Sequence, residues 1–345
     1  LKIPNIKGGT VNGTVAGQDY VGLLAGYVET TLGATGDALS DPVVGKLVDD
    51  ITGTGTVDGR SKVGGLIGMV KGPQFAGHAD KTNIGQAAVF EEWIARLEGI
   101  ASSVAVTGSG TNIGGVIGES YEITVNLSNT TGAITGGDVV GGIVGYGYRC
   151  AELDCYSTGN ITGTKLVGGI IGSGSFRSSV RRCWSEGNIT GTGGTYPGQI
   201  IASTAGVGGI AGYINLDFIN ECYSLGDIMA VYRAGGLVGS CNGMEEYSPN
   251  FYRCYAQGDI AVSGSQVGGL VGFMFSTGAV EFEQCYCTGA VTGSLSGALI
   301  GVRGSYIEYG EEYAIVNPNW NQVQGTVVYM SDCFYNSDVN TASNQ

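Results

Sequence analysis

The chain is poor in charged residues, in proline and in histidine. Charged side chains make up 13% of the 345 residues, and there are 6 prolines and a single histidine, His78. The net charge is −14 and no run of lysine and arginine occurs, so a surface that binds nucleic acid or anionic lipid is not expected. No apolar stretch approaches the roughly 18 residues that cross a bilayer. We therefore expect no nucleic-acid partner and no membrane insertion within this chain.

The usual signatures of catalysis are missing as well. One histidine cannot supply the zinc motif His-Glu-x-x-His, and no Cys-x-x-Cys pair occurs. We find no nucleophile–base set and no phosphate-binding loop, so we expect no catalytic residues, no metal and no cofactor. Acidic pairs stand beside tyrosines at Glu245-Glu246 and Glu311-Glu312. A carboxylate–aromatic cleft there would suit a glycoside hydrolase or lyase, but a solvated acidic loop is the favoured interpretation.

Glycine is the residue that the chain has in excess. It supplies 64 residues, more than twice the usual share of about 7%. Because 43% of the residues are hydrophobic, a folded chain with a large core is expected rather than disorder, and no Gly-X-Y period indicates collagen. The sequence begins at Leu1 without the features of a signal peptide. We expect a processed or trimmed product, with any signal peptide or anchor outside it.

The glycines belong to a repeated hexamer. It reads Val63-Gly64-Gly65-Leu66-Ile67-Gly68 and returns six times with Ile, Val or Ala in the first place. The copies are at 63–68, 113–118, 140–145, 167–172, 207–212, 234–239 and 267–272, with looser copies at 21–26 and 296–301. A spacing of 27 residues appears three times between neighbouring copies, and we take it as the bare repeat.

A second element lies between the hexamers. It begins Cys-aromatic-small and continues with glycine, a small or polar residue, and Ile or Val. Its copies start at Cys155, Cys183, Cys222, Cys254, Cys285 and Cys333. With a period of two, Cys155, Ser157 and Ile161 fall on one face of a strand, and Tyr156 and Thr158 fall on the other. Both elements are expected to be strands, since glycine disfavours a helix.

Two short strands cannot bury an apolar face alone, but stacked copies can. The sequence therefore predicts an all-β solenoid, a single domain over 1–345, with about nine coils of two or three strands each. Inward-facing glycines would let the two sheets approach closely. Longer spacings predict loop insertions at 28–50, 70–102, 192–206, 241–250 and 302–332, all but 192–206 on one edge of the rod. Within 70–102, apolar residues at helical spacing predict one short amphipathic helix over 86–97.

This combination resembles the GLUG repeat, named for its Gly-Leu-hydrophobic-Gly core. Three hexamers match that core letter for letter, including Gly65-Leu66-Ile67-Gly68, and the resemblance extends from 21 to about 340. GLUG repeats occur in bacterial surface and adhesin-like proteins and in non-catalytic regions of IgA-cleaving metallopeptidases. The resemblance implies a bacterial, extracellular or cell-surface setting and brings no catalytic residues.

Three rows of side chains are candidate sites. A row of aromatic side chains could bind sugar rings or could simply stack from coil to coil; its members are Tyr156, Trp184, Tyr223, Tyr255 and Tyr286. An inward row of thiols is expected to be a structural ladder without disulfides; its members are Cys155, Cys183, Cys222, Cys254 and Cys285. A row of amides and carboxylates could bind calcium, although capping of turns is favoured; its members are Asn160, Asn188, Asp227, Asp259 and Asp338.

The expected function is that of a monomeric, non-catalytic adhesion or structural module, secreted or on the cell surface. Its partner would be a host or microbial glycan, or a surface protein, bound at the edge that carries the insertions. The alternatives are a polysaccharide lyase or hydrolase built on a β-helix and an inert stalk or spacer.

Overall fold

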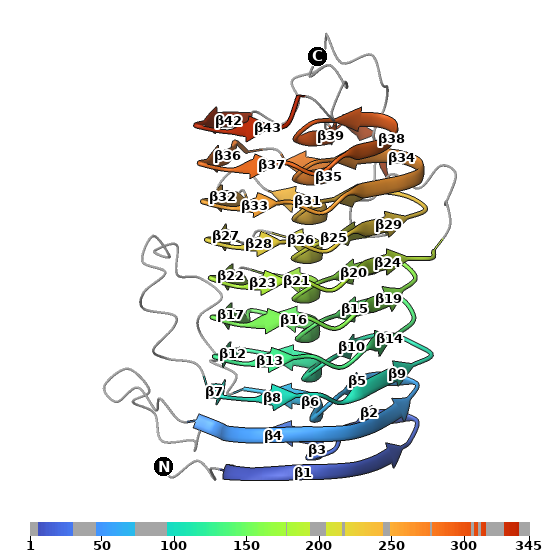
Figure 1. Ribbon diagram of the computed structural model, residues 1–345, viewed down its shortest axis with the longest axis vertical. Coiled ribbons are helices and arrows are strands. Elements are labelled where there is room, and N and C mark those ends of the chain that lie inside the picture. Colours follow the sequence, from blue (N-terminus) through green and yellow to red (C-terminus); the bar gives the residue numbers. More distant parts are fainter. Residues whose placement is uncertain are drawn as a thin grey trace.

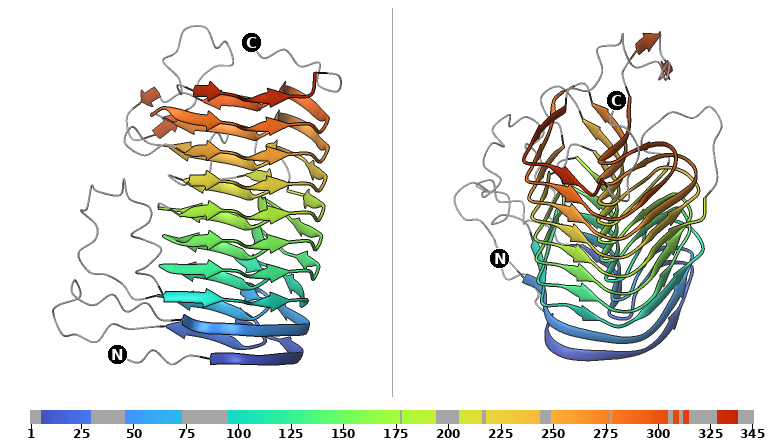
Figure 2. Two further views of the ribbon diagram at one scale, coloured as in Figure 1. Left: turned by 60° about the vertical axis from the view of Figure 1, so that its left-hand side comes forward. Right: turned by 45° about the horizontal axis from the view of Figure 1, so that its top comes forward.

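The chain winds into a parallel β-solenoid. The computed structural model describes residues 6–29, 46–72, 95–176, 178–193, 205–215, 218–243, 249–276, 278–304, 307–309, 312–314 and 328–337. Within these ranges the secondary structure is all β, and each coil lies on the one before it (Figure 1 and Figure 2). The strands form one 32-stranded sheet, one 9-stranded sheet and a two-stranded hairpin. The predicted fold class is confirmed.

A complete coil contains five short strands rather than the two or three expected. The first row is β7 Ala95–Glu98, β12 Ile123–Asn126, β17 Ala151–Leu153, β22 Ser179–Arg181, β27 Phe218–Asn220, β32 Asn250–Tyr252, β36 Val280–Glu283 and β42 Val328–Ser331. The second row is β8 Ala101–Ser102, β13 Asn129–Thr130, β18 Tyr156–Ser157, β23 Trp184–Ser185, β28 Tyr223–Ser224, β33 Tyr255–Ala256, β37 Tyr286–Cys287 and β43 Phe334–Tyr335. The third row is β9 Ala105–Gly108, β14 Ile134–Thr135, β19 Ile161–Gly163, β24 Ile189–Gly191, β29 Ile228–Ala230 and the first parts of β34 Ile260–Gly268 and β38 Val291–Gly297.

The remaining rows carry the hexamers. The fourth row is β2 Asp19–Val21, β5 Ser61–Gly64, β10 Ile113–Gly114, β15 Val139–Gly141, β20 Leu166–Gly168, β25 Gly206–Gly208, β30 Ala234–Gly235 and the last parts of β34 and β38. The fifth row is the nine-stranded sheet: β3 Ala25–Glu29, β6 Ile67–Lys71, β11 Ile117–Tyr121, β16 Val144–Tyr148, β21 Ile171–Ser175, β26 Ala211–Asn215, β31 Val238–Gly243, β35 Val271–Ser276 and β39 Ile300–Gly304. The first coils are simpler and use the long strands β1 Ile6–Ala16 and β4 Lys46–Gly59, and the hairpin is β40 Ile307–Tyr309 with β41 Glu312–Ala314. Nine fifth-row strands match the nine hexamers.

The hexamer is not a single strand, and this expectation was wrong. In the copy at 167–172, β20 ends at Gly168 and β21 begins at Ile171, so Gly169 and Ile170 form the bend between the two sheets. A Cβ on Gly169 would overlap the carbonyl oxygen of Gly209 and lie 2.5 Å from Cβ of Ser185 in the second row. The glycine pair is therefore required because the bend packs directly against the next coil and the facing strand.

The second element follows its predicted faces. Cys155, Ser157 and Ile161 are buried, whereas Tyr156 and Thr158 are only half-buried on the outside. Copies stand in exact parallel register, since Tyr156 pairs with Trp184 and Ser157 with Ser185. The alternation of apolar and polar residues predicted these faces because one face of the strand is buried in the core and the other faces solvent.

A glutamate interrupts one apolar column of the core. The first-row column of inward side chains includes Val125, Glu152 and Val180 on consecutive coils. Glu152 is fully buried, and neither of its carboxyl oxygens has a hydrogen-bond partner. Burial raises the pKa of Glu152 to about 8. The carboxyl group is therefore neutral at neutral pH.

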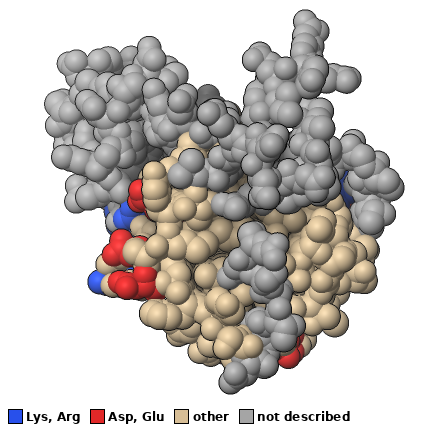
Figure 3. Space-filling view, turned by 90° about the horizontal axis from the view of Figure 1, so that it is seen from above, with Lys and Arg blue, Asp and Glu red and all other residues tan. Residues whose placement is uncertain are grey.

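The corner between the first and second rows holds one left-handed residue in every described coil. The φ angle at these positions lies between +49° and +69°, and two of them are glycine. The residues are Gly8, Asp50, Gly99, Leu127, Asp154, Arg182, Glu221, Arg253, Gln284 and Asp332. Charges on neighbouring coils pair here, with Arg182 Nε 2.7 Å from Asp154 Oδ1. Viewed down the long axis, the visible charges concentrate on the side of the first-row strands (Figure 3).

The predicted insertions begin and end at corners of the coil. Those at 28–50, 70–102, 241–250 and 302–332 connect a fifth-row strand to the next coil, and 192–206 connects β24 to β25. Their interiors fall largely outside the described residues. The helix predicted over 86–97 is wrong at its end, because Ala95–Glu98 is strand β7, and residues 86–94 lie outside the described ranges. Leu97 is buried in the solenoid core.

Candidate functional site

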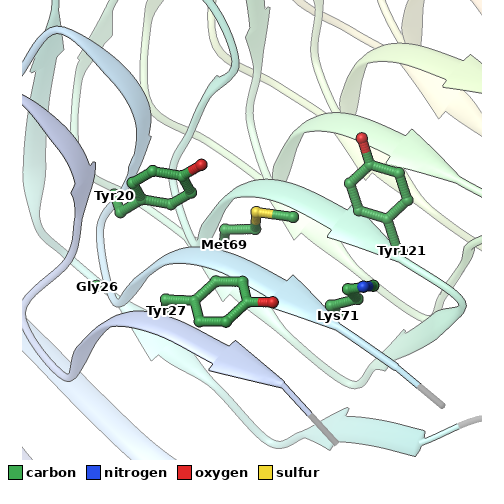
Figure 4. Close-up of a pocket in the computed structure, with 6 residues that line it drawn as sticks. All are labelled: Tyr20, Gly26, Tyr27, Met69, Lys71 and Tyr121. Carbon is green, nitrogen blue, oxygen red and sulfur yellow. The ribbon is translucent and has the colours of Figure 1, made fainter.

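A pocket opens on the outer face of the fifth-row strands near the N-terminal end of the rod. Its volume is about 730 Å³. Its lining residues are Tyr20, Gly26, Tyr27, Met69, Lys71 and Tyr121. The side chains of Tyr20, Tyr27, Lys71 and Tyr121 border a common space around Met69 (Figure 4). Three aromatic rings around one concave space are the most ligand-like feature among the described residues.

The parallel register brings these side chains together from three coils. Tyr27 of β3 aligns with Met69 of β6, and Met69 aligns with Glu119 of β11. Two residues further along each strand, Lys71 aligns with Tyr121. The two columns share the outward face because their members are two residues apart on each strand. Tyr20 reaches the pocket from the middle of β2, and its ring meets that of Tyr27 edge to face at 6.0 Å.

The cation behind Tyr20 is neutralised. Lys62 Nζ is 3.1 Å from Glu119 Oε1 and lies 4.8 Å from the centre of the Tyr20 ring. Asn112 Nδ2 donates to the other carboxylate oxygen of Glu119 at 2.5 Å. Glu119 is thus held by Lys62 of the preceding coil and by Asn112 of its own coil, and its buried charge is balanced.

The cation inside the pocket is neutralised too. Lys71 Nζ is 3.0 Å from Glu29 Oε1, and the Tyr27 hydroxyl donates to Glu29 Oε2 at 2.8 Å. Hydrogen bonds from Lys71 and Tyr27 lower the pKa of Glu29. Burial and the neighbouring carboxylate of Glu29 raise the pKa of Tyr27, and burial and Glu119 raise the pKa of Tyr121. The phenols therefore remain protonated, and the pocket offers aromatic faces and hydroxyl groups without a net charge.

The rings of the predicted aromatic row pack against one another from coil to coil. The ring centres of Tyr223 and Tyr255 are 4.8 Å apart and nearly parallel, and those of Tyr255 and Tyr286 are 4.9 Å apart. Trp184 meets Tyr156 and Tyr223 edge to face. All five rings lie in the row that the sequence placed them in, and none of them lines the pocket described above. The stacking interpretation accounts for them.

The thiols of the cysteine ladder donate hydrogen bonds to backbone carbonyl oxygens at the corner between the first and second rows. All five thiols are buried and free. Cys155 Sγ donates to the carbonyl oxygen of Leu153 at 3.1 Å, and Cys183 Sγ donates to that of Arg181 at 3.2 Å. Ser128 occupies the same position one coil earlier, and its hydroxyl donates to the carbonyl of Asn126 at 2.8 Å. The ladder supplies weak donors to corner carbonyls.

We expect a free-thiol count to reflect this arrangement. All nine cysteines lie in described residues as free thiols; eight are buried and Cys333 is partly exposed. A thiol-specific reagent should react with at most one thiol per native molecule and with nine after denaturation without reductant. Burial of Cys150 and Cys287 raises the pKa values of these thiols to about 12 and about 11, which slows the reaction further. A denatured count below nine would reveal a disulfide and contradict the ladder.

The row of amides and carboxylates forms hydrogen bonds between coils. The backbone N–H of Asn188 donates to Asn160 Oδ1 at 3.1 Å, and that of Asp227 donates to Asn188 Oδ1 at 3.1 Å. The pattern continues to Asp259 and Ala290, at 2.9 and 2.8 Å. Each side chain thus caps the next coil rather than its own turn. Across the described ranges, no group of three His, Cys, Asp or Glu side chains is placed to hold a metal ion. Asp338 lies outside those ranges.

The sequence contained a signal for the pocket that the repeat analysis missed. The first and third residues after each hexamer point outward from the fifth-row strands, and they are Tyr27 and Glu29, Met69 and Lys71, and Glu119 and Tyr121 in the first three coils. These positions vary along the chain, whereas the repeat was defined by positions that do not. The acidic pair at 245–246 and the side chains at 308–313 lie outside what the structure describes.

Three comparisons with known proteins gave no match. No protein-family model, no curated protein and no solved structure matches it. The described part of the chain also contains no helix long and apolar enough to cross a bilayer.

Proposed function

We propose that the chain is a non-catalytic bacterial surface or secreted module that binds glycan. The observation that carries the proposal is the uncharged pocket bordered by Tyr20, Tyr27 and Tyr121. A tyrosine ring combines a flat apolar face with a polar tip, which suits a sugar ring that has apolar faces and a rim of hydroxyl groups. Glu29 and Lys71, the last residues of β3 and β6, stand where the insertions predicted at 28–50 and 70–102 depart. The pocket thus lies at the edge where the sequence predicts binding.

A binding role is favoured over hydrolysis by the state of the carboxylates. A general acid in a glycosidase needs a raised pKa. Lys71 and Tyr27 instead lower the pKa of Glu29, and Lys62 and Asn112 hold Glu119. The likeness of the repeat to GLUG proteins supports an extracellular or cell-surface location.

A glycan array followed by titration calorimetry tests the proposal. We expect at least one glycan to bind, and we expect Tyr27→Ala to weaken its affinity about tenfold. Tyr223→Ala is the matched control, because Tyr223 is a half-buried outer ring that stacks on Tyr255 away from the pocket, so it should leave the affinity unchanged. An empty array would favour the inert spacer, and turnover of a bound polysaccharide would favour the enzyme.

A further inference from the structure

Tyr121 belongs to the pocket and also begins a run of aromatic rings along the rod. Its ring centre is 5.7 Å from that of Tyr148 on the next coil, and Tyr148 is 4.9 Å from Phe176 on the coil after that. Tyr121 and Tyr148 are in register on β11 and β16. Phe176 follows directly on Ser175, which is the residue in register with Tyr148 on β21. The three rings therefore extend the lining of the pocket parallel to the long axis.

The coils that carry this run make short corners after it, and the run ends in an exposed ring. β11 passes to β12 through a single residue, Glu122, and β16 passes to β17 through Arg149 and Cys150. Glu122, Arg149 and Phe176 all adopt left-handed backbone angles, so this conformation is a property of the corner. At Phe176 the corner presents a large apolar ring that is 49% exposed. An exposed aromatic ring continuous with a pocket is a feature of binding surfaces.

The charges beside the run are balanced, as they are in the pocket. Arg149 lies over the Tyr148 ring at 5.5 Å, and its Nη1 is 3.4 Å from Glu122 Oε1. Lys71 is paired with Glu29 at the other end. An anionic ligand would have to displace a carboxylate from its cation, whereas an uncharged one would leave both pairs intact.

We infer that the pocket and the aromatic run form one track for a neutral oligosaccharide lying parallel to the rod. This inference rests on the proposed glycan-binding function and specifies its ligand. One sugar occupies the space among Tyr20, Tyr27 and Tyr121, and the following sugars lie on Tyr148 and Phe176. Because the run adds contacts only for a chain of several sugars, affinity depends on chain length.

Calorimetry with oligosaccharides of defined length tests the track. The probes are cello-, xylo-, manno- and malto-oligosaccharides of two to six sugars, with hexagalacturonate as the anionic probe. We expect the best-bound series to gain affinity with length and hexagalacturonate not to bind. Phe176→Ala should remove most of that gain, about tenfold for the hexamer, and leave the dimer unchanged. Tyr27→Ala should weaken the dimer and the hexamer alike.

Leu127→Ala is the matched control for Phe176→Ala. Leu127 is also left-handed, large, apolar and 55% exposed, but it lies at the corner between the first and second rows. It should not change the affinity of any probe. If Phe176→Ala leaves the hexamer affinity intact while Tyr27→Ala weakens it, the track is wrong and the pocket remains. If hexagalacturonate binds more tightly than the neutral series, the ligand class is wrong. If no probe binds, the proposed function fails together with the track.

Discussion

Replacing Glu152 with glutamine is expected to abolish a large loss of stability that the wild-type protein shows as the pH rises from about 5 to about 8. The carboxyl group lies in the core between Val125 and Val180 on the adjoining coils and has no hydrogen-bond partner. An ionised carboxylate in that position would be a buried charge without compensation. The folded protein therefore keeps the proton.

The sign of the effect follows from the two pKa values. The pKa of Glu152 is about 8 in the folded state, against 4.5 as the ordinary value. Between these values the unfolded chain has lost the proton and the folded chain has kept it, so the free energy of unfolding falls by about 1.4 kcal/mol per pH unit. The full contribution is present below pH 4.5, and up to roughly 5 kcal/mol is lost by about pH 8.

Urea unfolding from about pH 5 to about pH 9 measures this slope. The difference between wild type and Glu152→Gln cancels every other titrating group, His78 included. Glu152→Val, which continues the valines of the adjoining coils, should remove the slope in the same way and keep the core packed. Parallel pH profiles for wild type and both variants would show that the carboxyl group is not protonated in the folded state.

A single methyl group on Gly169 is expected to destabilise the solenoid by about 3 kcal/mol or more. The added Cβ would overlap the carbonyl oxygen of Gly209 in the next coil and press on Ser185. The Gly209 carbonyl group and Ser185 are both fixed by packing between the coils, so a local shift cannot relieve the strain. The urea midpoint of Gly169→Ala should fall sharply, or the variant should fail to fold.

Gly147→Ala is the matched control for this substitution. A Cβ on Gly147 would lie 3.0 Å from the terminal methyl group of Ile171, which can move, and no backbone atom lies closer. Gly147 is in fifth-row strand β16, beyond the bend of its own coil. The control should fold with a midpoint near that of the wild type. Equal losses in the two variants would mean that the close approach at Gly169 does not set the cost, since chain entropy alone would make a Gly→Ala substitution stabilising.

The solenoid could be predicted because its repeated positions have a fixed environment. The repeat positions of Cys155 and Ser157 face inward in each coil, and the alternation of residue types along the strand shows this from the sequence alone. The hexamer could not be resolved in this way, since all of its residues are buried, and a pattern without alternation does not distinguish a strand from a bend. The predicted helix has the same origin, because a short apolar run such as that ending at Leu97 fits a helix and a buried strand equally well.

The pocket could not be predicted from the sequence, for a different reason. Tyr27 and Tyr121 are 94 positions apart in the chain and meet only because three coils stack in register. The stacking aromatic row was a candidate site instead, since its members, Trp184 and Tyr223 among them, recur at a fixed place in the repeat. Regular recurrence marked the residues that hold the rod together, whereas the pocket is made of residues that differ from coil to coil.

The side-chain hydrogen bonds between the turns all run in the same sense along the rod. Asn160 accepts from the backbone of Asn188, and Asn188 accepts from that of Asp227, so the acceptor always belongs to the earlier coil. Backbone bonds at the same turns run in the opposite sense, because the N–H of Ile161 donates to the carbonyl oxygen of Asn188 and that of Ile189 donates to the carbonyl oxygen of Asp227. Each inner turn is therefore bonded to both of its neighbours, so cutting the stack anywhere along these turns leaves unpaired donors and acceptors on both cut ends.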